Sequence, residues 1–98
     1  MYAVLQGYAF DPASSAELKH QITDECVPLL RRMPGFVACY WLDSGTGAGA
    51  WLCAFEDQAS AAAALALLAD RIPARLAALA GAPEMLAGAV AVYANAGL

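Results

Sequence analysis

The sequence predicts an α+β fold in which four antiparallel strands form one sheet and two helices cover one of its faces. Two aromatic runs, over residues 36–42 and from residue 48 or 50 to 55, flank a turn rich in Gly, Ser and Asp, which is typical of a β-hairpin. The segments before this hairpin read as a strand and then a helix, and those after it as a helix and then a strand. We therefore expect the order βαββαβ in a single domain over residues 1–98.

The first segment, residues 2–10, alternates with a period of two, which predicts a strand. Neither of its faces carries a charge, so both faces of the sheet are expected to be covered. Asp11 and Pro12 then form a turn. Ser14 or Ser15 follows as the expected N-cap of a helix, because a short side-chain oxygen can accept from the free N–H groups of the first turn.

The second segment is a helix that runs to about residue 33. Its apolar residues recur at steps of three and four and predict the side that packs on the sheet, namely Leu18, Ile22, Cys26, Leu29 and Met33. Gln21 is expected to lie off this side. Pro28 has no N–H to donate, so we expect it to bend the helix or to loosen one turn near residue 24.

The hairpin has a preferred register if its turn centres near Thr46. That register gathers both tryptophans on one side of the sheet, whereas a shift by one residue would separate them. Three cross-strand pairs follow from it: Trp41 with Trp51, Cys39 with Cys53, and Val37 with Phe55.

The second helix is expected to begin at Glu56 or Asp57, because acidic side chains suit the positive end of a helix. Pro73 should kink or split it, and residues 81–83 should end it. A last strand is predicted over residues 86–94. With right-handed crossovers, this order closes into a ferredoxin-like sheet with two helices on one face.

The composition predicts a partner for the uncovered face of that sheet. Hydrophobic residues make up 61% of the chain and charged residues 14%, against about 45–50% and about 25% in typical domains. A small domain cannot bury that much apolar surface alone, so we expect a homodimer that packs through its sheet faces. The alternative is that the abundant Ala residues inflate the apolar share.

Charge and segment length argue against other partners. The net charge is −4 with five basic residues, and no basic stripe is present, which argues against nucleic acid. The longest apolar run, residues 61–69, is about half of the roughly 20 residues that a membrane span needs. The first residues do not form a secretory signal. We therefore expect a cytoplasmic protein without a membrane segment.

The three cysteines stand singly, at positions 26, 39 and 53, and no pair has Cys-x-x-Cys spacing. This pattern argues against a disulfide framework and against a zinc site. We expect the cysteines to act as small buried apolar side chains, and we expect no metal.

His20, the only histidine, is the candidate catalytic residue. It lies on the first helix beside the apolar stripe, where it could serve as a general base near a cavity between the helices and the sheet. The alternative is a histidine that faces solvent, since no second titratable group is placed to orient it.

Four strand residues are the candidate ligand-binding residues: Gln6, Tyr8, Trp51 and Phe55. Aromatic side chains can line a pocket for a planar organic molecule, although aromatic residues at strand spacing also build plain cores and dimer interfaces. Gln6 and Tyr8 are the more informative, because a polar group in the middle of a strand needs a partner if it is buried.

Three stretches carry a resemblance to a known family. They are the helix exit over residues 27–36, which ends in Pro-Gly-Phe, the strand run Cys39-Tyr40-Trp41, and Phe55-Glu56-Asp57 ahead of an Ala-rich helix. With them the chain resembles the dimeric α/β-barrel superfamily, and in particular its antibiotic biosynthesis monooxygenase-like branch.

This resemblance implies a homodimer whose sheets pack face to face, with a cavity between helices and sheet in each subunit. Active members oxidise polycyclic aromatic substrates with dioxygen and use no metal or flavin. The haem-degrading relatives combine an Asn on the first strand, a Trp at the end of the third and a His on the second helix. Here Gln6 or Gly7, Phe55, and only Ala and Leu stand at those places, which argues against haem degradation, although Trp51 could partly substitute in a cavity.

The resulting hypothesis is a cofactor-independent, monooxygenase-like protein that binds a planar aromatic small molecule between its helices and its sheet. The alternative is a non-catalytic dimeric module of the same fold, for ligand binding or for structure. An open cavity with convergent polar groups would favour the first function, and a cavity filled by side chains would favour the second.

Overall fold

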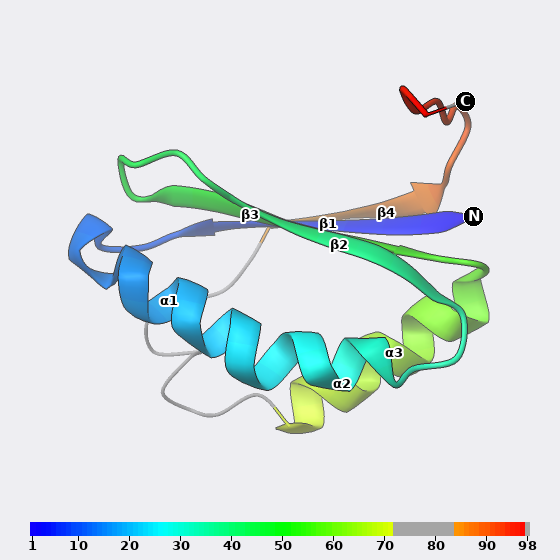
Figure 1. The fold of residues 1–98 in the computed structure, drawn as a ribbon, viewed down its shortest axis with the longest axis horizontal. Helices are drawn as coiled ribbons and strands as arrows, with labels where there is room; N and C mark the ends of the chain where they lie inside the picture. Colours follow the sequence, from blue (N-terminus) through cyan, green and yellow to red (C-terminus); the bar gives the residue numbers. More distant parts are fainter. Residues whose placement is uncertain (72–83, 98) are drawn as a thin grey trace.

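The computed structural model of the chain describes residues 1–71 and 84–97. Its four strands form one antiparallel sheet in the order β2-β3-β1-β4, and the helices lie on one side of that sheet (Figure 1). The predicted α+β, ferredoxin-like order βαββαβ is confirmed. The elements are β1 (Tyr2–Ala9), the 3-10 turn η1 (Pro12–Ser14), α1 (Ser15–Gln21), the π turn η2 (Ile22–Cys26), α2 (Val27–Arg31), β2 (Phe36–Asp43), β3 (Ala48–Phe55), α3 (Gln58–Arg71) and β4 (Glu84–Ala89).

The first helical segment opens on a different cap from the one predicted. The Oδ1 atom of Asp11 accepts from the N–H of Ala13 at 3.0 Å and caps η1, and the chain passes from η1 directly into α1. Ser14 occupies the N-cap position of α1, but its side chain makes no capping bond. The 3-10 turn η1 takes the place of a side-chain cap, because the backbone is already helical where α1 begins.

Pro28 loosens the helix where the sequence predicted it. Since its ring nitrogen carries no hydrogen, the carbonyl of Asp24 loses its usual helical donor. The chain responds with the π turn η2, in which the N–H of Val27 bonds to the carbonyl of Ile22, five residues back. The wide turn shifts the buried side by one residue, so that Leu30, not Leu29, is fully buried.

Gln21 was expected off the packed side of this helix, and that expectation is wrong. It follows Leu18 by three residues, which places both on the same side of α1. Its side chain is 4% exposed, and it is the polar residue in the buried set of the described chain.

The hairpin register is confirmed for two of its three predicted pairs. Trp41 lies opposite Trp51, and Cys39 lies opposite Cys53. The third prediction, Val37 opposite Phe55, is wrong, because an irregularity between residues 36 and 38 leaves Val37 out of the pairing and 47% exposed. Phe36 takes its place opposite Phe55, and the two rings meet edge to face with centroids 5.9 Å apart.

Asp57 caps the second helix, which begins one residue later than expected. Its Oδ1 atom accepts from the N–H of Ser60 at 2.7 Å, and α3 starts at Gln58. The expected kink at Pro73 and the expected end at residues 81–83 lie outside the described residues. Among the described residues, no helix has both the length and the apolar character that a membrane span requires.

The last strand lies earlier than predicted, at Glu84–Ala89 and not at residues 86–94. It pairs with β1 from Gly7 opposite Glu84 to Tyr2 opposite Ala89. Beyond that point one further bond joins the N–H of Val90 to the carbonyl of Met1 at 2.9 Å.

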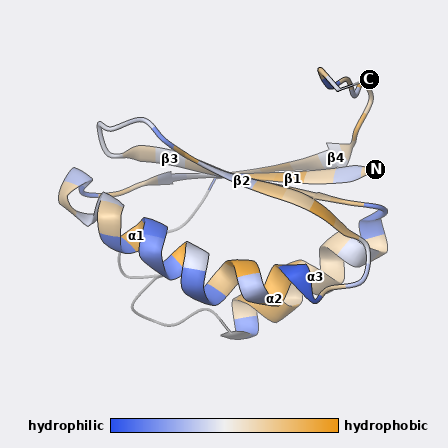
Figure 2. Cartoon of the chain, viewed as in Figure 1, coloured by the Kyte–Doolittle hydropathy of each residue, from blue (hydrophilic) through white to orange (hydrophobic). Residues whose placement is uncertain are grey.

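The helices of the described residues cover one face of the sheet, although both faces are largely apolar. The core lies between the sheet and the helices and contains Val4, Leu18, Leu30, Trp51 and Phe55, all at most 6% exposed. The other face, here called the open face, carries the row Tyr40, Leu52, Leu5 and Leu86, which lie opposite one another across all four strands. Figure 2 shows hydrophilic residues on the outer side of α1, while the strands are mostly pale or hydrophobic.

The cap of α3 gives a pH-dependent prediction. The hydrogen bonds from Ser60 hold the pKa of the Asp57 carboxyl below its ordinary value, so the ionised form is favoured in the folded state. The stability it contributes is present above the ordinary pKa and is lost as the pH falls through the lowered one. We expect Asp57→Ala to lower Tm by a few degrees at neutral pH and by much less at about pH 3.

Thermal denaturation followed by circular dichroism across this pH range measures that difference. Asp70→Ala, an exposed carboxylate on the same helix, is the matched control and should leave Tm nearly unchanged. A Tm deficit for Asp57→Ala that stays constant from neutral to acid pH would contradict the prediction.

Candidate functional site

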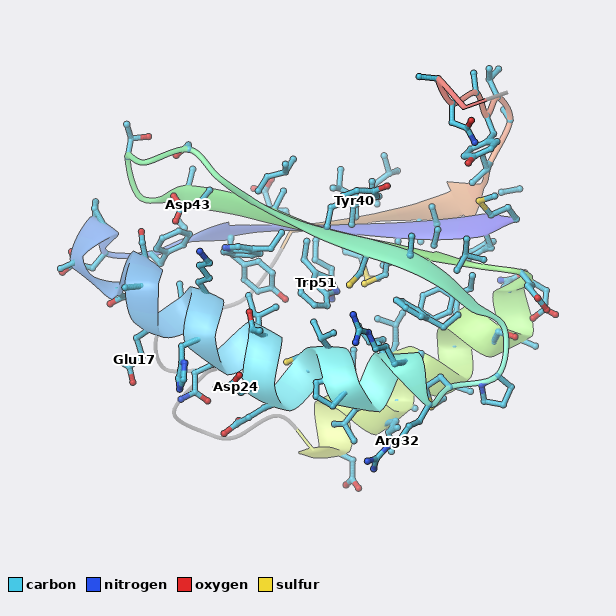
Figure 3. The ribbon with its side chains drawn as sticks, viewed as in Figure 1. Glu17, Asp24, Arg32, Tyr40, Asp43 and Trp51 are labelled. Atoms are coloured by element: carbon cyan, nitrogen blue, oxygen red, sulfur yellow. The ribbon has the colours of Figure 1, made fainter. Side chains whose placement is uncertain are left out.

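The four predicted ligand-binding residues share the helix-facing side of the sheet. Gln6 and Tyr8 alternate with Leu5 and Gly7 along β1, and Trp51 and Phe55 alternate likewise along β3. In the sheet, Gln6 lies directly opposite Trp51, and Trp51 lies opposite Trp41. Figure 3 shows Trp51 pointing from the sheet toward the helices, on the side opposite Tyr40. The alternation of the strands therefore brings these side chains together.

Aromatic rings gather at the end of this layer near the start of α1. The ring of Trp41 lies 6.1 Å from that of Tyr8 and 5.9 Å from that of Phe10, centroid to centroid. Gly49 makes this arrangement possible: a Cβ atom at that position would lie 2.8 Å from the Trp41 ring. Trp41 can therefore extend from β2 across β3 to reach Tyr8, which lies opposite Gly49 on β1.

The predicted aromatic residues differ in their surroundings. Phe55 is 1% exposed and packs on Phe36, so it is a core residue. The indole of Trp51 hydrogen-bonds the side chain of Cys53. The indole Nε1 of Trp41 is also buried, yet it has no hydrogen-bond partner among residues 1–71 and 84–97.

His20 lies apart from these residues. Its side chain is 72% exposed, and its Nε2 atom lies 3.0 Å from Oδ2 of Asp24, one turn further along the helix. Figure 3 shows Asp24 on the side of the helix away from the strands. The structure thus places the candidate general base on the solvent side, as in the alternative that the sequence left open.

Gln21 is the site residue that the sequence pattern missed. It projects from α1 into the layer between helix and sheet, and its Oε1 atom is buried without a hydrogen-bond partner in the described chain. The signal that could have found it is its spacing, since it stands three residues after Leu18 and directly before Ile22, both of which are buried.

The phenol and the thiols of this layer are neutral at pH 7. Burial raises the pKa of the Tyr8 phenol above its ordinary value. Burial also raises the pKa of the Cys26 thiol to about 11 and that of the Cys53 thiol to about 12. The layer therefore presents a phenol, thiols, amides and an indole, which can donate or accept hydrogen bonds without charge. In the described part of the chain, no three His, Cys, Asp or Glu side chains gather to hold a metal ion.

A hollow of about 420 Å³ lies on the open face and not beneath the helices. It is lined by apolar residues of three strands and of the chain just after β4, including Leu5, Leu52, Leu86 and Val90. With no titratable side chain in its lining, this hollow offers apolar contact and no chemistry.

Comparison of sequences gives no match: neither a protein-family model nor a curated protein is similar enough to the chain. Solved structures do match its fold. The monooxygenase ActVA-Orf6 of Streptomyces coelicolor, solved in complex with nanaomycin D, is 16% identical with a TM-score of 0.75, over 96% of this chain and 92% of that chain. SnoaB, a cofactor-independent oxygenase from Streptomyces nogalater, is 16% identical with a TM-score of 0.71, over 94% of each chain.

A third match, MhuD, was solved with two manganese protoporphyrin IX molecules per active site. It is 14% identical with a TM-score of 0.79, over 97% of this chain and 99% of that chain. Further matches include a structure described as an antibiotic biosynthesis monooxygenase and others from proteins of unknown function. The chain has the fold of the antibiotic biosynthesis monooxygenases. The resemblance predicted from the sequence is thereby confirmed at the level of the fold.

Within this monooxygenase fold, the residues do not fit a haem iron held by a side chain. Such an iron takes a histidine, a thiolate, a thioether or a phenolate as its axial ligand. The single histidine of the sequence, His20, faces solvent, and the raised pKa values keep the Tyr8 phenol and the Cys26 and Cys53 thiols protonated. The described interior therefore offers no histidine, thiolate or phenolate to a porphyrin iron.

The contact between Gly49 and Trp41 gives a second prediction. Gly49→Ala should push the Trp41 indole away from Tyr8 and strain β2, because the added methyl group would overlap the indole ring and the backbone carbonyl of Leu42. We expect a loss of about 1–3 kcal/mol in the free energy of unfolding and a changed tryptophan signal in near-UV circular dichroism.

Gly7→Ala is the matched control, since a Cβ atom there meets nothing closer than 4.0 Å. It should leave both the stability and the near-UV spectrum close to those of the unmodified chain. Equal effects of the two substitutions would contradict the role of Gly49.

Proposed function

We propose that the chain is a cofactor-independent, monooxygenase-like protein that binds a planar aromatic small molecule between α1 and the sheet. The carrying observation is the helix-facing layer itself, where the aromatic rings of Tyr8, Trp41 and Trp51 adjoin the uncharged polar groups of Gln6 and Gln21. Flat indole and phenol rings suit a flat ligand, and a few polar groups fix its orientation. The match to ActVA-Orf6 and SnoaB supports this assignment.

The chemistry that fits this layer is oxidation of an electron-rich ring by dioxygen. In an anthrone, the ring methylene carbon becomes a carbonyl: one atom of O2 enters the product, and the other leaves as water with the two methylene hydrogens. His20 is outside the layer, and the phenol and thiols within it are protonated at neutral pH. The substrate should therefore carry its own acidic hydrogen, as anthrones and quinols do, while the protein binds it and excludes water.

Oxygen uptake with a panel of anthrones and quinols, in air and under nitrogen, tests this function. Tyr8→Phe removes only the hydroxyl and should lower kcat/KM by about tenfold while Tm changes little. Tyr93→Phe is the matched control, because Tyr93 is 62% exposed in the segment after β4. The absence of oxygen uptake with every compound would contradict an oxygenase.

The alternative, a non-catalytic ligand-binding or structural module of the same fold, is favoured by the exposed position of His20 and by a hollow that lies on the open face and not between α1 and the sheet. Saturable binding of an anthraquinone without oxygen uptake would support a binding module. The lack of both would favour a structural one.

We further propose that two copies form a homodimer through their open faces. The row across this face exposes Leu5, Tyr40 and Leu86 by 37%, 61% and 71%. Exposed apolar side chains in one contiguous row favour burial against a second surface of the same kind. The hollow between Leu5, Leu52 and Leu86 would receive side chains of the second copy.

Leu86→Glu should weaken this dimer. Because Leu86 is exposed in the single chain, the substitution should spare the monomer fold but place a charge in the interface. We expect the dimer dissociation constant to rise by at least about tenfold in sedimentation equilibrium.

Ala66→Glu, on the exposed side of α3, is the matched control and should leave the dissociation constant unchanged. A chain that sediments as a monomer before any substitution would contradict the dimer.

A further inference from the structure

Two buried polar atoms in the helix-facing layer lack hydrogen-bond partners in the described chain. They are Oε1 of Gln21, an acceptor on α1, and Nε1 of Trp41, a donor on β2. The Gln21 side chain is 4% exposed, so solvent hardly reaches it. Buried side-chain polar atoms are bonded in the large majority of native structures, and an exception requires a reason.

The stability of the fold does not explain why these two polar atoms are buried without partners. A leucine or a methionine at position 21 would fill a similar volume without a buried carbonyl. The other indole of the layer shows that this interior can satisfy such a donor, because Trp51 hydrogen-bonds Cys53. Gln21 and Trp41 therefore carry a cost to stability that the neighbouring Trp51 does not.

We propose that Gln21 and Trp41 read the polar groups of the bound ring system, an inference that rests on the proposed function. The Oε1 atom of Gln21 accepts from a hydroxyl of the ligand, and the Nε1–H of Trp41 donates to a carbonyl oxygen of the ligand. The ligand class is then a hydroxylated aromatic ketone or quinone, and not an unsubstituted hydrocarbon. These two residues set specificity and take no part in bond making or breaking.

The charges around the layer are mixed. Besides burial, the carboxylate of Glu25 raises the pKa of the Cys26 thiol further, whereas the guanidinium of Arg31 acts to lower the pKa of the Cys39 thiol. The thiols and the phenol themselves are protonated. A hydroxyl and a carbonyl on the ligand would hydrogen-bond the two unpaired atoms without adding a charge.

Matched probes separate the donor from the acceptor. The first pair, 2-(hydroxymethyl)anthraquinone and 2-ethylanthraquinone, differs only in the hydroxyl donor. The second pair compares 2-(hydroxymethyl)anthraquinone with 2-(hydroxymethyl)anthracene, which lacks the carbonyl acceptors. In tryptophan-fluorescence titrations, the unmodified chain should bind the hydroxymethyl quinone about tenfold more tightly than either analogue. Gln21→Leu should abolish the tighter binding of the hydroxymethyl quinone relative to the ethyl quinone. Trp41→Phe should abolish its tighter binding relative to the anthracene.

The ligand-free proteins provide an independent readout. Gln21→Leu should raise Tm, because it removes an unpaired buried carbonyl, whereas loss of a structural amide would lower Tm. Gln58→Leu, at an exposed position, is the control and should change neither Tm nor binding.

Each outcome has a distinct meaning. If the hydroxymethyl and ethyl quinones bind equally well, a buried water satisfies Gln21; the inference is then wrong while the proposed function stands. If Gln21→Leu lowers Tm and keeps the preference, the amide is structural and the inference is wrong. If no probe binds, the proposed function fails, and the inference fails with it.

Discussion

The constraint on which this structure depends is a sheet that is apolar on both faces, only one of which is covered by the helices of the described residues. One row across the four strands, Trp41, Trp51, Gln6 and Met85, faces the helical layer. The row beside it, Tyr40, Leu52, Leu5 and Leu86, faces outward. Because strand side chains alternate, no shift of register could hide both rows in one subunit. The helical layer accounts for the core and the candidate site, and the outward row is the surface on which the proposed second copy would pack.

The site follows from how the helical layer is filled. Gly49 leaves room for Trp41, the π turn before Pro28 shifts the buried side of the helix onto Leu30, and the one histidine stays outside. The aromatic rings and amides inside carry no charge, and burial keeps the phenol and the thiols protonated. In the proposed function this layer binds and orients a planar molecule, and it supplies little acid–base chemistry of its own. That is why the proposed reaction relies on the acidity of the substrate.

Much of this architecture could be predicted from the sequence because it follows from local rules. The period of each segment, the aromatic pairing of the hairpin and the effect of Pro28 need only neighbouring residues. The irregularity at Val37 and the bounds of β4 could not be predicted, because they depend on pairing with a partner strand. The site was predicted in part: strand alternation brought Gln6, Tyr8 and Trp51 together, whereas the burial of Gln21 depends on how the helix is rotated against the sheet.

Hydroxyl-radical footprinting of the unmodified chain tests most directly whether the outward row is covered. His20, which is 72% exposed on the helical side, serves as an internal reference for Tyr40 and Leu86, which are 61% and 71% exposed in a single chain. At micromolar concentration, Tyr40 and Leu86 should be oxidised far less than these exposures imply, and the protection should vanish on dilution. Full oxidation of both residues at every concentration would contradict a covered open face.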